Sequence, residues 1–252
     1  MKSNQDSIEG WHWHEGGFLT CDLLTEWRHG FFTRSYTQMP VDLQMRFYQS
    51  GQVYRIKQVH GDRVLEHTEY DPLDQLPEAD GIWISGRVSD EASAWVCSAD
   101  CVPVLIGDRS IGSVAAVHAG WRGTAAGIIG KTIERFVDRG SNLADLRIAL
   151  GPAISGESYQ VSQQVADLVL ASIKVATGIS PDPQLDRYRL DLRAVQQQQL
   201  LEIGVSIEQL SIAPYCTLQT PEYFHSYRRN VLENPTNIGK SPQVQWSGIA
   251  IA

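Results

Sequence analysis

The segment from Ser113 to Gly127 constrains the fold more than any other part of the chain. Its first five residues, SVAAV, are small and apolar, which is typical of a buried strand. The strand pattern ends on His118, and Gly120, Arg122 and Gly123 follow before a helical pattern begins. Polar side chains at a strand end, held in a glycine-rich turn, are placed for chemistry rather than for filling a core.

Two other junctions of this kind carry a metal-ligating side chain. Cys101 stands in SADCVPVL between two strand-like runs, and His60 in KQVHGDRV follows a third run. Two imidazoles and one thiolate suit a zinc ion that keeps its fourth position open, so His60, Cys101 and His118 are the predicted metal ligands. We expect Asp100, the neighbour of Cys101, to orient a metal-bound histidine or to move protons. Asp80, directly before a glycine, is instead interpreted as a turn-forming residue.

The order of elements predicts an α+β protein, a single domain over residues 1–252 with mixed β-sheets flanked by helices. Short strand-like runs dominate the first half of the chain, and helices alternate with strands in the second. Residues 1–17 are expected to form a flexible N-terminal tail. The predicted helices are Thr124–Arg139, Ser162–Gly178 and Leu192–Ile203, the last with the glutamines Gln196–Gln199 on a solvated face. The predicted strands are Phe18–Leu24, Gly30–Arg34, Val53–Val59, Gly81–Ser85, Ala94–Ser98, Val102–Ile106, Ile111–Val117, Leu146–Leu150, Ile207–Ala213 and Gln245–Ile251.

Composition excludes several classes of partner. The formal net charge of −8 argues against binding to nucleic acid or to an anionic membrane. The N-terminus lacks the apolar stretch of a signal peptide, and no apolar run reaches membrane-spanning length. Four cysteines at irregular spacing are too few for a disulfide scaffold, which favours a reduced, cytoplasmic protein.

Basic and aromatic residues gather near the C-terminus, in CTLQTPEYFHSYRRN. An aromatic shelf beside guanidinium groups can bind a flat ring next to phosphate oxygens. We therefore predict that Arg34, Tyr227, Arg228 and Arg229 bind substrate. Arg122 is expected to join them, so that the site takes a small anionic co-substrate.

Seven ordered motifs resemble one family, the laccase-domain group: HGFFTR, KQVHGDRV, EADG, SADCVPVL, HAGWRGTAAGI, LGPAISGESYQV and FHSYRRN. Members of this group have been described as multicopper polyphenol oxidases and later as zinc-dependent purine nucleoside phosphorylases with adenosine deaminase activity. The chain departs from the family pattern at Ser35–Met45, which is shorter and lacks a glycine pair.

The resemblance implies a zinc ion on His60, Cys101 and His118, and phosphorolysis of adenosine, inosine and methylthioadenosine with phosphate, accompanied by deamination of adenosine. The residues expected to carry catalysis are His60, Asp100, Cys101, His118 and Arg122.

A copper-dependent polyphenol oxidase is the first alternative. Such an enzyme needs a type 1 site and a trinuclear cluster, whereas the chain has seven histidines and one H-x-H pair, His12 and His14, in the expected tail. Copper at a single site of two histidines and one cysteine would then be an adventitious substitute for zinc.

Two further alternatives change the role of the three ligands. In a metal-free hydrolase or transferase, Cys101 would be the nucleophile and His118 its base. In a non-catalytic binding module, a fourth protein ligand such as Cys216 or His225 would close the coordination sphere.

Overall fold

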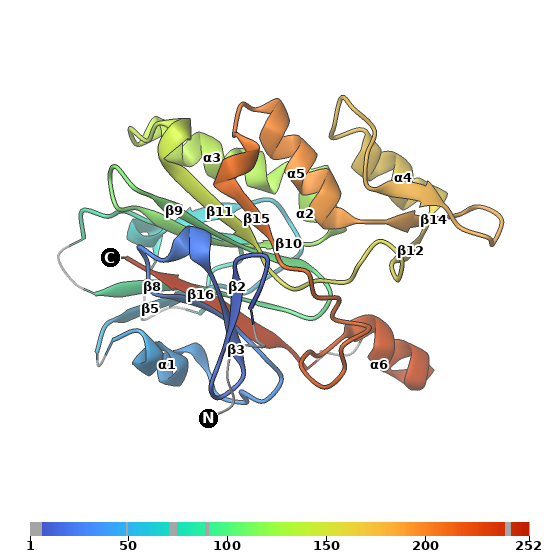
Figure 1. The fold of residues 1–252 in the computed structure, drawn as a ribbon, viewed down its shortest axis with the longest axis horizontal. Coiled ribbons are helices and arrows are strands. Elements are labelled where there is room, and N and C mark those ends of the chain that lie inside the picture. Colours follow the sequence, from blue (N-terminus) through green and yellow to red (C-terminus); the bar gives the residue numbers. More distant parts are fainter. Residues whose placement is uncertain (1–6, 49, 71–74, 89–90, 240–242, 252) are drawn as a thin grey trace.

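Two large β-sheets are stacked face to face, and helices cover the outer face of one of them (Figure 1). The computed structural model describes residues 7–48, 50–70, 75–88, 91–239 and 243–251. Within these residues the predicted architecture, an α+β domain with mixed sheets and flanking helices, is confirmed.

The sheets mix antiparallel and parallel pairs. The parallel pairs are β5 (Gln52–Arg55) with β8 (Ala92–Ser98), β6 (Val64–Glu66) with β7 (Gly81–Ile84), and β11 (Leu146–Leu150) with β15 (Leu210–Ile212). The seven-stranded sheet has the order β1 (Ser7–Ile8), β2 (Trp11–His14), β3 (Phe18–Cys21), β4 (His29–Phe32), β16 (Gln245–Ala250), β8 (Ala92–Ser98), β5 (Gln52–Arg55). The six-stranded sheet has the order β15 (Leu210–Ile212), β11 (Leu146–Leu150), β9 (Val102–Asp108), β10 (Val114–Ala119), β7 (Gly81–Ile84), β6 (Val64–Glu66). A small third sheet has the order β12 (Gln160–Ser162), β14 (Arg187–Leu190), β13 (Ile179–Pro181).

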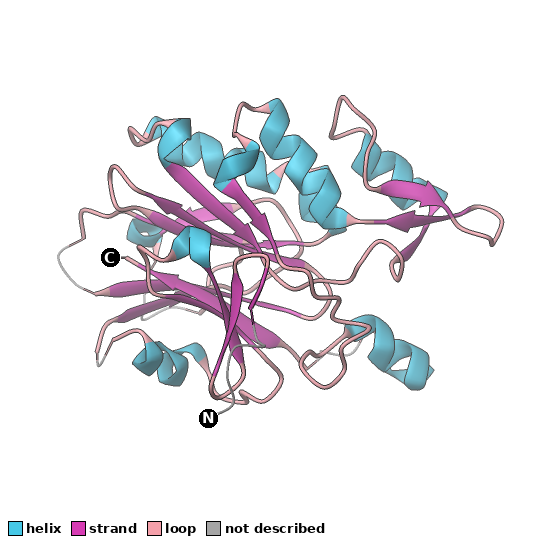
Figure 2. Cartoon of the chain, in the orientation of Figure 1, coloured by secondary structure: helices cyan, strands magenta, loops and turns pink. Residues whose placement is uncertain are grey.

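Figure 2 shows how the helices are distributed around these sheets. In the described part of the chain the α-helices are α1 (Pro40–Leu43), α2 (Trp121–Ala125), α3 (Ile128–Asp138), α4 (Gln163–Leu170), α5 (Leu192–Glu202) and α6 (Tyr227–Glu233). The predicted helix Thr124–Arg139 is therefore two helices. Gly127 separates them, with a φ of 74° in the left-handed region that glycine adopts without strain.

The six-stranded sheet is buried on both faces, which explains its continuous apolar strands. In β9, Val104 and Ile106 pack with residues of α3 such as Phe136, whereas Leu105 between them faces the other sheet and packs with Val96. Successive side chains of a strand point to opposite faces, so one strand contributes to two cores. One core lies between helices and sheet, and the second lies between the two sheets.

The expected N-terminal tail is wrong for the residues that the structure describes. Residues 7–14 form β1 and β2 at the edge of the seven-stranded sheet, and residues 1–6 lie outside the described residues. Trp11 is fully buried, and its indole Nε1 donates to Ser211 Oγ at 2.9 Å. The alternation Trp-His-Trp-His was the strand signal, because the indole of Trp11 can then be buried while His14 faces solvent.

The glutamine run in α5 also differs from the expectation of a solvated face. Gln196 and Gln199 are buried, and their amide groups donate to Thr124 Oγ1 and to the carbonyl of Thr124, respectively. These bonds connect α5 to α2, while the apolar Leu201 in the same helix is 39% exposed. Polar side chains with partners can occupy a helix face that a pattern of apolar residues alone would assign to solvent.

Two connections cross from one large sheet to the other at the same end of the molecule. β8 belongs to the seven-stranded sheet and β9 to the six-stranded sheet, so the short turn of residues 99–101 links them. The segment of residues 56–63 makes the same crossing, from β5 to β6. These two crossings place their polar residues beside the C-terminal end of β10.

Burial of His29 predicts that the fold loses stability in acid. Its ring is held neutral in the core, where Nε2 accepts from the backbone N–H of Cys21 and Nδ1 donates to the Trp27 carbonyl. Burial lowers the His29 pKa from 6.5 to about 4. Between these pH values the unfolded chain binds a proton that the folded chain does not, so the free energy of unfolding falls as pH falls, by on the order of 1 kcal/mol per pH unit.

This effect can be measured by urea unfolding at several pH values from 7 to 4, for the protein and for His29→Gln. The unfolding free energy of His29→Gln should depend less steeply on pH than that of the unchanged protein, by on the order of 1 kcal/mol per pH unit. Equal slopes for the two proteins would show that His29 does not carry the effect.

Candidate metal centre

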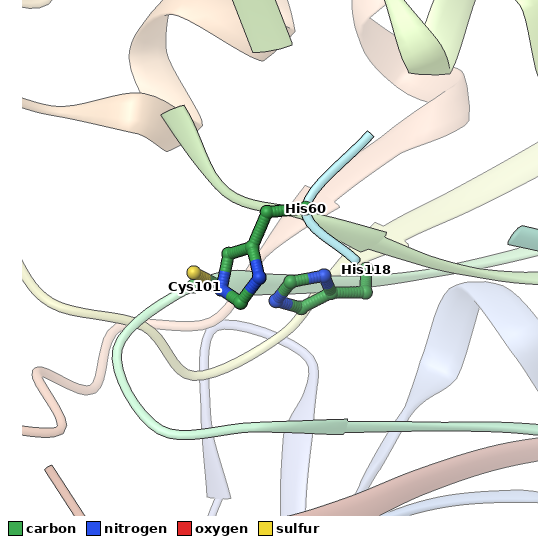
Figure 3. A group of neighbouring side chains, drawn as sticks. All are labelled: His60, Cys101 and His118. Atoms are coloured by element: carbon green, nitrogen blue, oxygen red, sulfur yellow. The ribbon is translucent and has the colours of Figure 1, made fainter. Parts of the chain in front are cut away.

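The three predicted ligands lie together where the two crossings meet β10 (Figure 3). His60 comes from the segment between β5 and β6, Cys101 from the turn between β8 and β9, and His118 from β10. Their ligand atoms all lie within 4.8 Å of one another, and the two imidazole rings are nearly perpendicular, with centroids 4.8 Å apart. Residues far apart in sequence thus form one group of two histidines and one cysteine.

Asp80 holds the His60 segment in place. Its Oδ1 accepts from the backbone N–H of His60 at 2.9 Å, and its Oδ2 accepts from Gly61 at 2.7 Å and from Val59 at 3.2 Å. These bonds stabilise His60 in a left-handed conformation with a φ of 60°, which is uncommon for a residue with a side chain.

The same carboxylate also bonds His118. Oδ1 of Asp80 lies 2.8 Å from His118 Nδ1, and both side chains are almost completely buried. This contact keeps a proton on Nδ1, so Nε2 is the ring nitrogen that a metal would bind. The orienting carboxylate is therefore Asp80, which we had interpreted as a simple turn residue, and not Asp100.

Asp100 has structural contacts instead. One carboxylate oxygen accepts from Thr217 Oγ1 at 2.6 Å, and the other accepts from Ser226 Oγ and from the backbone N–H of Arg228, at 3.0 and 2.7 Å. These bonds attach the start of α6 to the turn that carries Cys101. The predicted catalytic role of Asp100 stays untested, but its oxygens already have three donors.

Two glycines make the close packing around the ligands feasible. A Cβ at Gly120 would lie 2.8 Å from Cys101 Sγ, and a Cβ at Gly123 would lie 2.8 Å from the Gly61 carbonyl oxygen. Both distances are shorter than van der Waals contact, so a side chain at either position would displace the site.

The electrostatics favour a thiolate at Cys101 in the metal-free protein. Burial raises the pKa of the thiol, but the charge of His118 and hydrogen bonds from His118 and His60 outweigh it, so this pKa is lowered to about 6. Burial lowers the pKa of His118, but Cys101 and Asp80 together raise it to about 9. A thiolate is the protonation state that binds a metal.

Tyr159 adjoins this centre and was missed in the sequence, where it appeared only within LGPAISGESYQV. The Arg228 guanidinium lies 5.2 Å from the centre of its ring, and the phenol is within electrostatic reach of Cys101 and Arg122. Burial raises the pKa of the Tyr159 phenol, which therefore stays protonated. A single tyrosine in a loop motif gives little functional signal until the fold places it.

The predicted anion-binding arginines differ in how far their guanidinium groups are already bonded within the protein. Arg122 is exposed, and its guanidinium lies 4.2 Å from the centre of the Trp121 ring. Arg228 donates to the Gln160 carbonyl at 2.9 Å. Arg229, by contrast, donates to the carbonyls of Thr217, Leu218 and Phe224, which makes it a brace for the segment before α6.

Two other predicted substrate residues have contacts of their own. Arg34 donates to the Pro221 carbonyl at 2.7 Å, and Tyr227 Oη accepts from the backbone N–H of Gly239 at 3.1 Å. Phe224, part of the expected aromatic shelf, is fully buried in the core between the sheets. Binding of substrate by Arg34, Tyr227, Arg228 and Arg229 stays a prediction.

Neither candidate for a fourth protein ligand belongs to the group. Among the described residues, the group that could hold a metal consists of His60, Cys101 and His118 only. Cys216 Sγ accepts from the backbone N–H of Ser155 at 3.2 Å, and His225 lies among Arg34 and Arg229, whose charges add to burial in lowering its pKa. A three-ligand site leaves a coordination position for substrate or water, unlike a closed structural site.

The H-x-H pair is a surface feature of β2. His12 bonds Asp22 and His14 bonds Thr20, each at 2.7 Å.

A membrane-spanning helix would need a longer apolar stretch than any helix in the described ranges provides.

The fold and the site define a class: an α+β domain in which, among the described residues, two histidines and one cysteine that could hold a metal lie at the junction of two stacked sheets. Residues 41–245 match the family model described as multi-copper polyphenol oxidoreductase laccase, and the chain belongs to this family. The resemblance seen in the motifs is thereby confirmed.

Relatives and solved structures agree with this assignment. Purine nucleoside phosphorylase slr1573 of Synechocystis sp. is 44% identical to this chain, covering 97% of each. Purine nucleoside phosphorylase Rv2149c of Mycobacterium tuberculosis is 35% identical, covering 78% of this chain and 72% of the relative. The crystal structure of YlmD from Geobacillus stearothermophilus has a TM-score of 0.82 at 22% identity, over 97% of this chain and 99% of that one, and shows the same fold.

Proposed function

We propose that this protein is a purine nucleoside phosphorylase that works with a zinc ion at His60, Cys101 and His118. The observation that carries the proposal is the open three-ligand group with Arg122, Tyr159 and Arg228 beside it. Its family membership and the names of its relatives support the same activity.

The donor set fits zinc. One thiolate and two imidazoles are ligands that zinc prefers, and the Asp80 contact leaves His118 Nε2 available. A bound zinc ion would supply a Lewis acid next to the substrate. Copper also binds such ligands strongly, so oxidase activity in a copper-loaded preparation would reflect the metal supplied.

The residues of this chain would then act on phosphate and on the nucleoside. In phosphorolysis, a phosphate oxygen bonds to C1′ of the ribose while the C1′–N9 bond breaks, and the purine base leaves with a proton. Guanidinium groups bind phosphate through paired hydrogen bonds, which is the role proposed for Arg122 and Arg228. Tyr159 offers a protonated phenol and a ring face beside them.

The test is chromatography of adenosine and inosine incubated with zinc-loaded protein, with and without phosphate. We expect free base and ribose 1-phosphate to appear only when phosphate is present. If the base were released at the same rate without phosphate, the protein would be a hydrolase and not a phosphorylase.

Deamination of adenosine and activity on methylthioadenosine rest on the family resemblance. They belong to the same proposal as accompanying reactions, and the same chromatograms report them. Inosine or hypoxanthine formed from adenosine would reveal deamination, and a run with methylthioadenosine would reveal the second substrate.

A metal-free Cys/His enzyme is the second candidate, because Cys101 and His118 are hydrogen-bonded to each other. Metal analysis together with alkylation separates the two. Activity that survives complete removal of metal and disappears when Cys101 is alkylated would favour the nucleophile.

Arg122→Lys is expected to lower kcat/KM by on the order of tenfold to a hundredfold, because an ammonium cannot reproduce a paired guanidinium contact to phosphate. The melting temperature should change little, since the contact with Trp121 is exposed. Arg109→Lys is the matched control, because Arg109 is exposed and paired with Glu26. If Arg122→Lys had normal turnover and a lowered melting temperature, Arg122 would stabilise the turn and not bind phosphate.

A further inference from the structure

A cavity of about 640 Å³ lies apart from the metal ligands, between the segments 155–157 and 178–180 and the residues that follow Ala213. Cys216, Arg193 and Asp191 line it, and Glu157 stands among its other lining residues. A cavity of this volume accommodates a small molecule. The metal centre does not account for these side chains.

Arg193 is a buried guanidinium at the wall of this cavity, ion-paired with Asp191 and with one nitrogen that lacks a hydrogen-bond partner among the described residues. The residue is 7% exposed, and Nη1 donates to the carbonyls of Ala213 and Tyr215. Its Nε lacks a hydrogen-bond partner among the described residues and lies 3.8 Å from Asp191 Oδ1, beyond hydrogen-bonding distance. Buried donors without partners are energetically costly, and a carboxylate is the group that a guanidinium binds best.

Cys216 lines the same cavity, and its sulfur is hydrogen-bonded there. Its Sγ accepts the backbone N–H of Ser155 at 3.2 Å and lies 3.8 Å from Ser158 Oγ. Burial raises the pKa of this thiol, but hydrogen bonds from Ser155 and neighbouring groups outweigh burial and lower it. The thiolate, which these bonds favour, is the nucleophile in thiol chemistry.

A direct chain connection links the cavity to the turn that carries Cys101. Cys216 is paired with Ala153 in an isolated parallel bridge. The hydroxyl of Thr217, the next residue, donates a hydrogen bond to Asp100. Cys216 therefore lines the cavity, whereas its neighbour Thr217 is hydrogen-bonded to the residue that precedes Cys101.

We propose that this cavity is a covalent modification site in which Cys216 forms a mixed disulfide with a small disulfide of the amino-acid type, whose carboxylate binds Arg193. The Cys216 thiolate attacks one sulfur of the ligand, the ligand's S–S bond breaks, and a new bond forms between that sulfur and Sγ. The other half of the ligand leaves as a thiolate and takes up a proton. Cys216 is oxidised and the departing half is reduced, so no other reactant is needed.

The test compares two small disulfides on the purified, zinc-loaded protein. Cystine carries carboxylates and ammonium groups, whereas cystamine carries ammonium groups only. Peptide mass mapping follows each cysteine separately, so reaction at Cys101 or Cys97 is not confused with reaction at Cys216. We expect cystine to label Cys216 at least about tenfold faster than cystamine does.

Variants then assign the preference to Arg193. Arg193→Lys should reduce the ratio of the two rates, while Arg189→Gln, at the rim of the same cavity and paired with Asp182, should leave it unchanged. Equal rates for both disulfides on the unmodified sequence, or no label at Cys216, would overturn the proposal even if a variant failed to fold. Because the readout is mass, the result does not depend on nucleoside cleavage.

Discussion

Replacing Cys101 with serine is expected to abolish both bound zinc and phosphorolysis. The thiolate is the single sulfur ligand of the group, and its ligand atom lies within 4.8 Å of those of His60 and His118. Losing a partner outside the coordination sphere already lowers metal affinity by about 10- to 100-fold, so losing a ligand should lower it by more. Metal content after dialysis and a chelator competition titration measure the effect.

Cys97→Ser is the matched control for this experiment. Cys97 lies four residues earlier, at the end of β8, and its backbone N–H and carbonyl both bond the side chain of Gln58. A serine preserves these backbone bonds, so zinc and activity should be retained. A Cys101→Ser protein with full zinc occupancy would remove Cys101 from the coordination sphere and favour the metal-free nucleophile.

The sequence was informative about the ligands because their signals are local. His60, Cys101 and His118 each follow or precede a strand-like run, and strand ends are where a sandwich presents side chains for chemistry. What the pattern could not show is that two connections cross between sheets at the same end. That crossing brings the three residues together, and it depends on long-range strand pairing such as β5 with β8 and β6 with β7.

Two errors in the sequence interpretation share one physical cause, which is that a polar side chain can be buried when distant residues satisfy it. Gln196 was assigned to solvent but donates to Thr124, 72 residues away. Asp80 was assigned to its own turn but bonds His118, 38 residues away. Local patterns contain no information on partners at such distances.

The glycines around the site show the opposite case, in which a local signal has a long-range cause. Gly120 and Gly123 belong to the glycine-rich turn that the sequence analysis assigned to chemistry. In the structure, Gly120 makes room for Cys101 Sγ, and Gly123 makes room for the Gly61 carbonyl oxygen. Other groups do come close to the backbone at this turn, and they belong to the protein itself.

Asp80→Asn is expected to lower zinc affinity by about 10- to 100-fold while the protein still folds. The carboxylate of Asp80 accepts bonds from His118 Nδ1 and from backbone N–H groups of the His60 segment, so it orients two of the three ligands. An amide has one accepting oxygen, and its NH₂ group would face a donor where the second oxygen now accepts. The imidazole and the segment would therefore lose their fixed positions without a change in side-chain volume.

Glu78→Gln, two residues earlier, is the control for Asp80→Asn. Glu78 forms an exposed ion pair with Lys57 at 2.9 Å, and exposed pairs contribute about 0–1 kcal/mol to stability. The zinc affinity of the Glu78→Gln variant should match that of the unchanged protein in the same chelator titration. Thermal unfolding of both variants with and without zinc separates a lost ligand orientation from a lost fold: Asp80→Asn should gain less stability from added zinc than Glu78→Gln gains. If the two variants bound zinc equally well, Asp80 would serve only to hold the loop, and His118 would owe its orientation to packing in β10.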